Sequence, residues 1–310
     1  MECTLVCDTN FRITRCDQKA SDVFMCPSDE WLIGKPILNF MTPLVANRHR
    51  CIFSHIFPRD KSFIQDVKHS MSNASRVVMY NASMMPMMCS VGIDIQKDHV
   101  KVKITRQSSF PTLADTIPDN YKKFINESPG KQHLEECERL TCVIMDLSGS
   151  TEYVVKHGGK KMANILAKVY QISANCVLEL YPFVYVHELI GDSVFLVVNA
   201  PFMIKYTYAN ASEIAIQVSK EIQCQTDILL NDTHMFLRVG IASGPVTAGV
   251  VDGRTFRLFG PTVHLAQRLE SVCPRGKIAM NLVDDLDNQV GITKCSTELK
   301  GFGLTDYYVV

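Results

Sequence analysis

The stretch Val186–Val198, VHELIGDSVFLVV, places a histidine and two carboxylates inside a run of strand-forming residues. Glu188 and Asp192 lie four residues apart, and Gly191 precedes the aspartate. A carboxylate beside Val, Leu and Phe side chains is costly unless it is paired or binds a cation. The stretch therefore indicates a site where each carboxylate has a partner or a metal ion.

A second aspartate stands in a similar place. In LTCVIMDLSGST, an apolar strand ends at Asp146 and a turn of small residues follows, with Gly149, Ser150 and Thr151. The free backbone N–H groups of such a turn can receive a phosphate. Two close carboxylates repel each other unless cations lie between them, and Mg²⁺ is usually held by one or two carboxylates together with phosphate oxygens. The pattern predicts two-metal chemistry on a nucleotide.

The elements that position these aspartates are predicted within residues 136–310. Apolar residues of the stretch 158–180 recur at helical spacing, and two strands flank a tight turn at Gly191 and Asp192. A second amphipathic helix is expected over about residues 209–224, followed by the strand HMFLRVGIASG. The order βαββαβ predicts a ferredoxin-like α/β sandwich, with Asp146 and Asp192 on one sheet edge.

Residues 1–106 have a different pattern, in which a strand is followed by short helices and then by further strands. This order resembles a PAS domain, most clearly in EWLIGKPILNFM. The resemblance implies an α/β sensor or dimerisation module for an unknown ligand or partner. Residues 107–135 contain three prolines and no sustained apolar period, so we expect a linker with one short helix. The whole chain is expected to mix α+β and α/β architecture.

Composition narrows the class of protein. Lys and Arg together number 32, as do Asp and Glu, so no global charge points to nucleic acid or to an anionic membrane. No apolar run is long enough to span a bilayer, and twelve cysteines at irregular spacing favour reduced thiols. We expect a cytoplasmic location, either as a separate protein or as the cytosolic part of a longer membrane protein.

Five segments of the second part carry a specific resemblance. VIMDLSGST, HELIGDSVF, LRVGIASGPVTAGVV, FRLFGPTVHLAQRLES and LKGFG occur in this order. Together they resemble the catalytic domain of class III nucleotidyl cyclases. In that family, the ribose 3′-hydroxyl attacks the α-phosphate in line and pyrophosphate leaves, a reaction that depends on positioning and charge stabilisation.

The resemblance implies a role for each matching position. Asp146 and Asp192 match the two aspartates that bind two Mg²⁺ or Mn²⁺ ions. Arg238 matches an arginine that contacts the polyphosphate, and Lys300 matches the lysine that grips the terminal phosphates. Arg268 matches the arginine that stabilises charge on the α-phosphate as it becomes five-coordinate.

Glu188 falls where this family reads the purine. Members that form cyclic GMP usually carry glutamate there, and members that form cyclic AMP usually carry lysine. Guanine presents N1–H and an N2 amino group side by side, which suits an acceptor-only carboxylate. Adenine presents an acceptor at N1, which a carboxylate would repel. Glu188 therefore favours GTP as the substrate.

Two positions depart from the family pattern. Arg257 stands at the second purine-reading position, commonly Cys or Asp, where it could donate to guanine O6. It could equally pair with Glu188 and close the purine pocket. His264 stands where the family usually has an asparagine that orients the ribose, and a histidine can still donate a hydrogen bond.

The resemblance also implies a head-to-tail homodimer. In this family the metal aspartates come from one subunit, while the purine-reading residues and the positions matched by Arg268 and Lys300 come from the other. The leading hypothesis is a guanylate cyclase that converts GTP to cyclic GMP under control of the PAS-like part. One alternative is an adenylate cyclase with an atypical purine pocket. Another is a degenerate cyclase that acts as a nucleotide-binding regulatory subunit.

Overall fold

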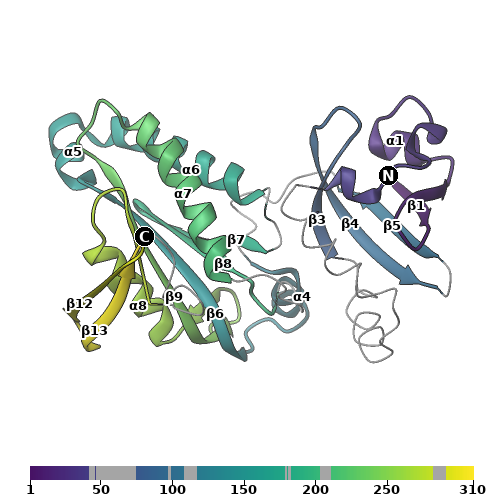
Figure 1. The fold of residues 1–310 in the computed structure, drawn as a ribbon. Coiled ribbons are helices and arrows are strands. Elements are labelled where there is room, and N and C mark those ends of the chain that lie inside the picture. Colours follow the sequence, from purple (N-terminus) through teal and green to yellow (C-terminus); the bar gives the residue numbers. More distant parts are fainter. Residues whose placement is uncertain are drawn as a thin grey trace. The chain divides into compact units, whose positions relative to one another are not determined.

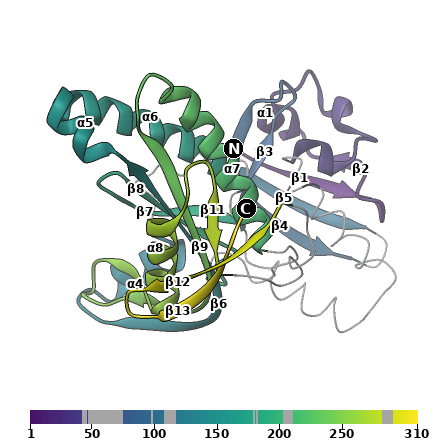
Figure 2. The same ribbon diagram turned by 60° about the vertical axis from the view of Figure 1, so that its left-hand side comes forward.

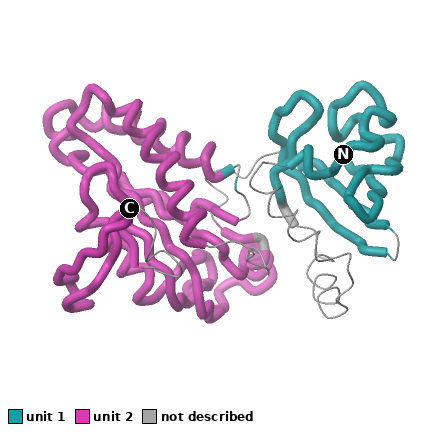
Figure 3. The backbone as a smooth tube through the Cα atoms, viewed as in Figure 1, with its two compact units in different colours: residues 1–112, 178–182 teal, residues 113–177, 183–310 magenta. Residues whose placement is uncertain are grey.

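The computed structural model describes most of the chain. The described residues are 1–41, 46, 75–96, 99–107, 117–178, 180, 183–202, 211–281 and 291–310. They form two compact units, Met1–Thr112 with Leu178–Pro182, and Leu113–Val177 with Phe183–Val310 (Figure 3). None of the helices described is both long and apolar enough to cross a membrane.

Unit 1 is a five-stranded antiparallel sheet with short helices. Its elements are β1 (Glu2–Cys7), β2 (Ile13–Cys16), α1 (Ala20–Phe24), η1 (Asp29–Leu32), η2 (Ile37–Phe40), β3 (Ser75–Tyr80), β4 (Pro86–Ile95) and β5 (Val100–Arg106). The strand order is β2-β1-β5-β4-β3. Alternate residues of the paired strands β1 and β5, such as Leu5 and Val102, are buried in one core with Phe24 and Phe40 of the helical segments.

Unit 2 carries the elements predicted around the two aspartates. Its elements are α4 (Asp119–Glu127), β6 (His133–Ser148), α5 (Ser150–His157), α6 (Gly159–Leu178), β7 (Val184–Ile190), β8 (Ser193–Val198), α7 (Ala211–Leu229), β9 (Phe236–Val250), β10 (Phe256–Phe259), α8 (Pro261–Val272), β11 (Ile278–Met280), β12 (Thr293–Leu299) and β13 (Gly303–Val309). Their sheet order is β12-β13-β11-β9-β6-β8-β7, with β10 paired to β9. From β6 to β9 the chain follows the predicted βαββαβ order, except that two helices, α5 and α6, stand where one was predicted between β6 and β7.

The segment expected to be a linker includes structured parts of unit 2. Residues 108–116 lie outside the described residues, but α4 and the first residues of β6 pack in this unit. Tyr121 of α4 is fully buried, its hydroxyl donates to Glu135 at 3.0 Å, and its ring lies 4.3 Å from that of Phe256. The one short helix predicted for the segment is thus anchored to β10.

Helices lie against both faces of the unit 2 sheet. Helices α6 and α7 lie side by side in Figures 1 and 2, and α7 packs against β6, β8 and β9. Helix α8 packs against β6, β9 and β11. A Cβ atom added to Gly240 of β9 would lie 2.1 Å from the Ala266 carbonyl oxygen and 2.2 Å from the Glu270 nitrogen. The neighbours Val239 and Ile241 point to the opposite face and are fully buried.

We predict that Gly240→Ala destabilises unit 2 strongly, because the new methyl group would meet helix backbone that cannot rotate away. The expected loss is about 3 kcal/mol in the free energy of unfolding, measured by urea denaturation followed by circular dichroism. Gly159→Ala is the matched control, since a Cβ atom there meets nothing within 4 Å. Equal stability of the Gly240→Ala and Gly159→Ala proteins would contradict the close approach of α8.

Candidate active site

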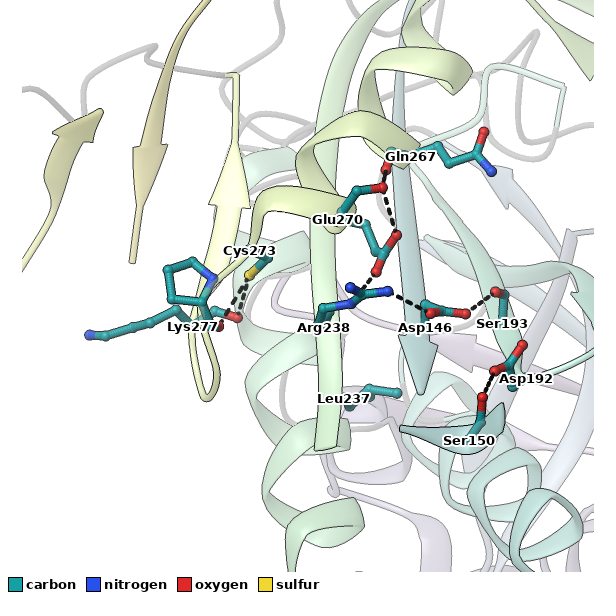
Figure 4. A network of polar contacts seen from close by, with 12 residues as sticks. Asp146, Ser150, Asp192, Ser193, Leu237, Arg238, Gln267, Glu270, Cys273 and Lys277 are labelled. Carbon is teal, nitrogen blue, oxygen red and sulfur yellow. Dashed lines mark hydrogen bonds and ion pairs between the residues drawn. The ribbon is translucent and has the colours of Figure 1, made fainter. Parts of the chain in front are cut away.

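Asp146 lies near the end of β6, between the two strands that pair with it. In the sheet register it stands opposite Arg238 of β9 on one side and Ser193 of β8 on the other. Arg238 Nη2 donates to Asp146 Oδ2 at 2.9 Å, and Ser193 Oγ donates to Asp146 Oδ1 at 2.6 Å (Figure 4). Both oxygens of Asp146 therefore have a partner, one of them a cation.

Asp192 lies in the turn that joins β7 and β8, as predicted. Gly191 adopts a positive φ of 60° in this turn, a conformation that glycine reaches without strain. Asp192 Oδ2 accepts a hydrogen bond from the hydroxyl of Ser150, the first residue of α5. Gly149 precedes this helix with φ 84°, and Thr151 follows as an exposed residue. The predicted turn of small residues thus opens a helix beside Asp192.

The donor set of this sheet edge suits a hard divalent cation that also binds phosphate. Ser193 is next to both carboxylates, because it follows Asp192 directly in the chain and its hydroxyl donates to Asp146. Among the described residues no group of three or more His, Cys, Asp or Glu could hold a metal by itself. Two carboxylates with phosphate oxygens match the way Mg²⁺ is usually bound in nucleotide sites.

Arg238 lies between two carboxylates. Besides Asp146, its Nε atom is 2.6 Å from Oε1 of Glu270 on α8. The two atoms form an ion pair, and neither has a hydrogen bond to any other described residue. Glu270 is 4% exposed, and burial raises its pKa to about 7 against the opposing effect of Arg238. Glu270 was not predicted from the sequence, and it shares the buried face of α8 with Ala266 and Leu269.

Three further residues predicted for the site are not joined to this network. His264 and Arg268 lie four residues apart on α8, hence on one face of the helix, and His264 is exposed. Lys300 lies in the exposed turn between β12 and β13. None of the three side chains has a hydrogen bond or ion pair to another residue in the described parts of the chain.

Glu188 and Arg257 form an ion pair through Oε1 and Nη1. A β-bulge sets this contact: Val186 pairs with Leu196 and Glu188 with Phe195, so that His187 is an extra residue in β7. This pairing is one of the two alternatives that the sequence left open for Arg257. The bulge was not predicted, because the run of strand formers does not reveal where the alternation breaks.

His187 is held inside the unit by this bulge. It is 5% exposed, and its ring lies 4.9 Å from that of Phe195 and 5.5 Å from that of Phe256. Burial, followed by the nearby Arg257 charge, lowers the pKa of His187 from 6.5 to about 3. The imidazole is therefore neutral in the folded protein at physiological pH.

This burial predicts an acid dependence of stability. The unfolded chain takes up a proton at His187 below its ordinary pKa of 6.5, whereas the folded chain does so only near 3, so the free energy of unfolding falls as the pH is lowered between them. His187→Phe should reduce this slope by about 1.4 kcal/mol per pH unit between about pH 4 and pH 6. Calorimetric unfolding at several pH values measures it. An unchanged slope would mean that His187 titrates in the folded protein.

Unit 2 contains the part of the chain that matches a known protein family. Residues 133–298, more than half of the chain, match the model of the adenylate and guanylate cyclase catalytic domain. Soluble guanylate cyclase gcy-34 of Caenorhabditis elegans is 30% identical over 182 residues, which is 57% of this chain and 26% of that protein. Soluble guanylate cyclase 89Da of Drosophila melanogaster is 32% identical over 157 residues, 49% of this chain and 22% of that protein. The chain thus spans about a quarter of the length of these relatives.

Solved structures similar to this chain include the guanylate cyclase domain of RhGC from Catenaria anguillulae in complex with GTP. It is 24% identical, with a TM-score of 0.48 and coverage of 57% of this chain and 97% of that one. The adenylyl cyclase CyaB from P. aeruginosa is 21% identical, with a TM-score of 0.48 and coverage of 57% and 96%. Because the family model matches more than half of its length, the protein belongs to the adenylate and guanylate cyclase catalytic domain family.

Proposed function

We propose that this protein is a guanylate cyclase that converts GTP to cyclic GMP and pyrophosphate. The observation that carries the proposal is the placement of Asp146 and Asp192 along one sheet edge, beside the N-terminus of α5. These carboxylates would hold two divalent cations, Mg²⁺ or Mn²⁺. Cations bound there supply charge neutralisation of the polyphosphate and activation of the ribose 3′-hydroxyl. The backbone N–H groups of Ser150 and Thr151 receive phosphate oxygens.

The active site is proposed to be shared between two copies of the chain. The side chains of Arg268, His264 and Lys300 have no ion-pair or hydrogen-bond partner among the described residues, which leaves them available to a second subunit. In a head-to-tail homodimer Arg268 stabilises the five-coordinate α-phosphate and Lys300 binds the terminal phosphates. His264 donates to the ribose.

Glu188 and Arg257 together are proposed to read guanine. The carboxylate accepts from N1–H and from the N2 amino group, while the guanidinium beside it donates to O6. Adenine presents a donor in place of O6 and an acceptor in place of N1–H. Its donor would then face the guanidinium of Arg257, and its acceptor would face the carboxylate of Glu188. The ion pair between Glu188 and Arg257 supports this arrangement, since it places donor and acceptor side by side.

Unit 1 is proposed to be a PAS-like module, over residues 1–106, that regulates or dimerises the cyclase through the segment 107–135. Its two strands, short helices and three further strands, arranged as one antiparallel sheet, support the resemblance. We propose a cytoplasmic location, either for a separate protein or for the cytosolic part of a longer membrane protein.

Product formation tests the proposal directly. The full-length protein with Mn²⁺ is given GTP or ATP, and cyclic products are quantified, with Asp192→Ala as the blank. We expect cyclic GMP, reduced by about 100-fold or more in the blank. Cyclic AMP as the main product would support the adenylate cyclase alternative. If a dimeric protein forms neither product above the blank, the regulatory-subunit alternative replaces the proposal.

Substitutions of Glu188 and Arg257 distinguish two roles of the ion pair, recognition of guanine and closure of the purine pocket. Glu188→Lys should lower kcat/KM for GTP by about 100-fold, because a cation would face guanine N1–H. Arg257→Met should raise KM for GTP about tenfold through loss of the donor to O6. An increase in kcat/KM for GTP in Arg257→Met would instead mean that the ion pair with Glu188 blocks the pocket. Gly159→Ala serves as a distant control.

A further inference from the structure

Two carboxylates share one guanidinium at the proposed metal site. Arg238 Nη2 bonds Asp146 at 2.9 Å, while Arg238 Nε lies 2.6 Å from Glu270 (Figure 4). Asp146 is one of the carboxylates proposed to bind divalent cations. Arg238 therefore occupies part of the space that a cation would use and already neutralises part of the charge of Asp146. Glu270 has no place among the residues that the proposed function requires.

Glu270 cannot leave this arrangement. Its side chain is 6% exposed, compared with 28% for Arg238 and 21% for Asp146. Helix α8 holds it against the sheet, because Gly240 lets the backbone at Glu270 approach β9 at a distance that no Cβ atom would permit. Its Oε1 atom has no hydrogen-bond partner in the described parts of the chain, and Oε2 accepts only a long 3.4 Å bond from Ser271.

A buried carboxylate in such a place keeps its charge only while a cation lies beside it. Removal of Arg238 from Glu270 would leave an unpaired charge away from water or force the carboxylate to take up a proton, and both are costly. Arg238 can release Asp146 at a smaller cost, because Asp146 keeps the hydroxyl of Ser193 and remains partly exposed. The two contacts of Arg238 therefore differ in how easily they break.

We propose that Glu270 is a positioning residue, which retains Arg238 in the site when a divalent cation replaces the arginine beside Asp146. Arg238 serves as the internal cation of the metal-free site, and Glu270 draws it away from Asp146 and holds it beside the polyphosphate once the metal binds. This inference rests on the proposed function, because it takes Asp146 and Asp192 as the metal ligands. The metal affinity of the site is then set by competition between Asp146 and Glu270 for Arg238.

The competition has a measurable consequence. Without the charge of Glu270, Arg238 has Asp146 as its sole carboxylate partner in this network, so a cation must displace a stronger ion pair. Glu270→Gln should therefore weaken binding of Mn²⁺ alone about tenfold. Arg238→Gln should strengthen it, because the competing cation is gone. If Glu270 acts through Arg238, Glu270→Gln should have less than about a twofold effect in the Arg238→Gln background.

The experiment is a double-mutant cycle on the full-length protein. Electron paramagnetic resonance measures free Mn²⁺ during titration of wild type, both single variants and the double variant, without nucleotide. Melting temperatures verify that each variant folds. Glu270→Gln is isosteric with the native side chain and keeps an acceptor, whereas Arg238→Gln shortens the side chain, removes its charge and keeps hydrogen-bond donors.

Each outcome decides between explanations. An equal loss of affinity on Glu270→Gln in both backgrounds would show a direct effect of charge on the metal, and would overturn the inference, as would no loss at all. Absence of Mn²⁺ binding in wild type, with none gained by Arg238→Gln, would also overturn it. Asp192→Ala distinguishes the two proposals: if it leaves Mn²⁺ binding intact, the proposed metal site itself is wrong. If Asp192→Ala abolishes binding while the cycle shows no coupling, only the role of Glu270 fails.

Discussion

The antiparallel pairing of β6 with β9 is the constraint on which unit 2 depends. It places Asp146 directly opposite Arg238, so that a carboxylate and a guanidinium face each other across the sheet. Two residues further along β9, Gly240 lets α8 approach the strand backbone. That approach brings Glu270 onto Arg238 and fixes the helix that carries His264 and Arg268. One strand pair thus positions both the carboxylate proposed to bind metal and the helix that carries residues proposed to contact the nucleotide.

The order of elements in unit 2 could be predicted because it depends on local periodicity. The turn at Asp192 was predictable from Gly191, which adopts the positive φ that the turn requires. The bulge at His187 was not, since Val, His and Glu are all compatible with a regular strand and the break in alternation depends on packing against Phe195 and Phe256. Tertiary contact, which a periodic pattern does not encode, decides such positions.

The same limit explains why Glu270 could not be predicted from the sequence as a site residue. A carboxylate on the buried face of a helix is normally unfavourable, so the pattern alone gives no reason to place it inside. Its partner Arg238 lies more than thirty residues earlier in the chain and reaches it only through the packing of α8 on β9. The ion pair of Arg257 with Glu188 also joins separate elements. Such pairs become visible when the register and the helix packing are both known.

The hairpin of β7 and β8 carries two carboxylates with different neighbours. Glu188 lies in β7, where it pairs with Phe195 in the regular part of the strand that follows the bulge. Asp192 lies four residues later, in the turn itself, after Gly191 with its positive φ. Glu188 meets Arg257 of β10, whereas Asp192 meets Ser150 of α5. The carboxylate proposed to read the purine and the carboxylate proposed to bind metal thus face different neighbours. This separation is what a site shared between two subunits would require of a single hairpin.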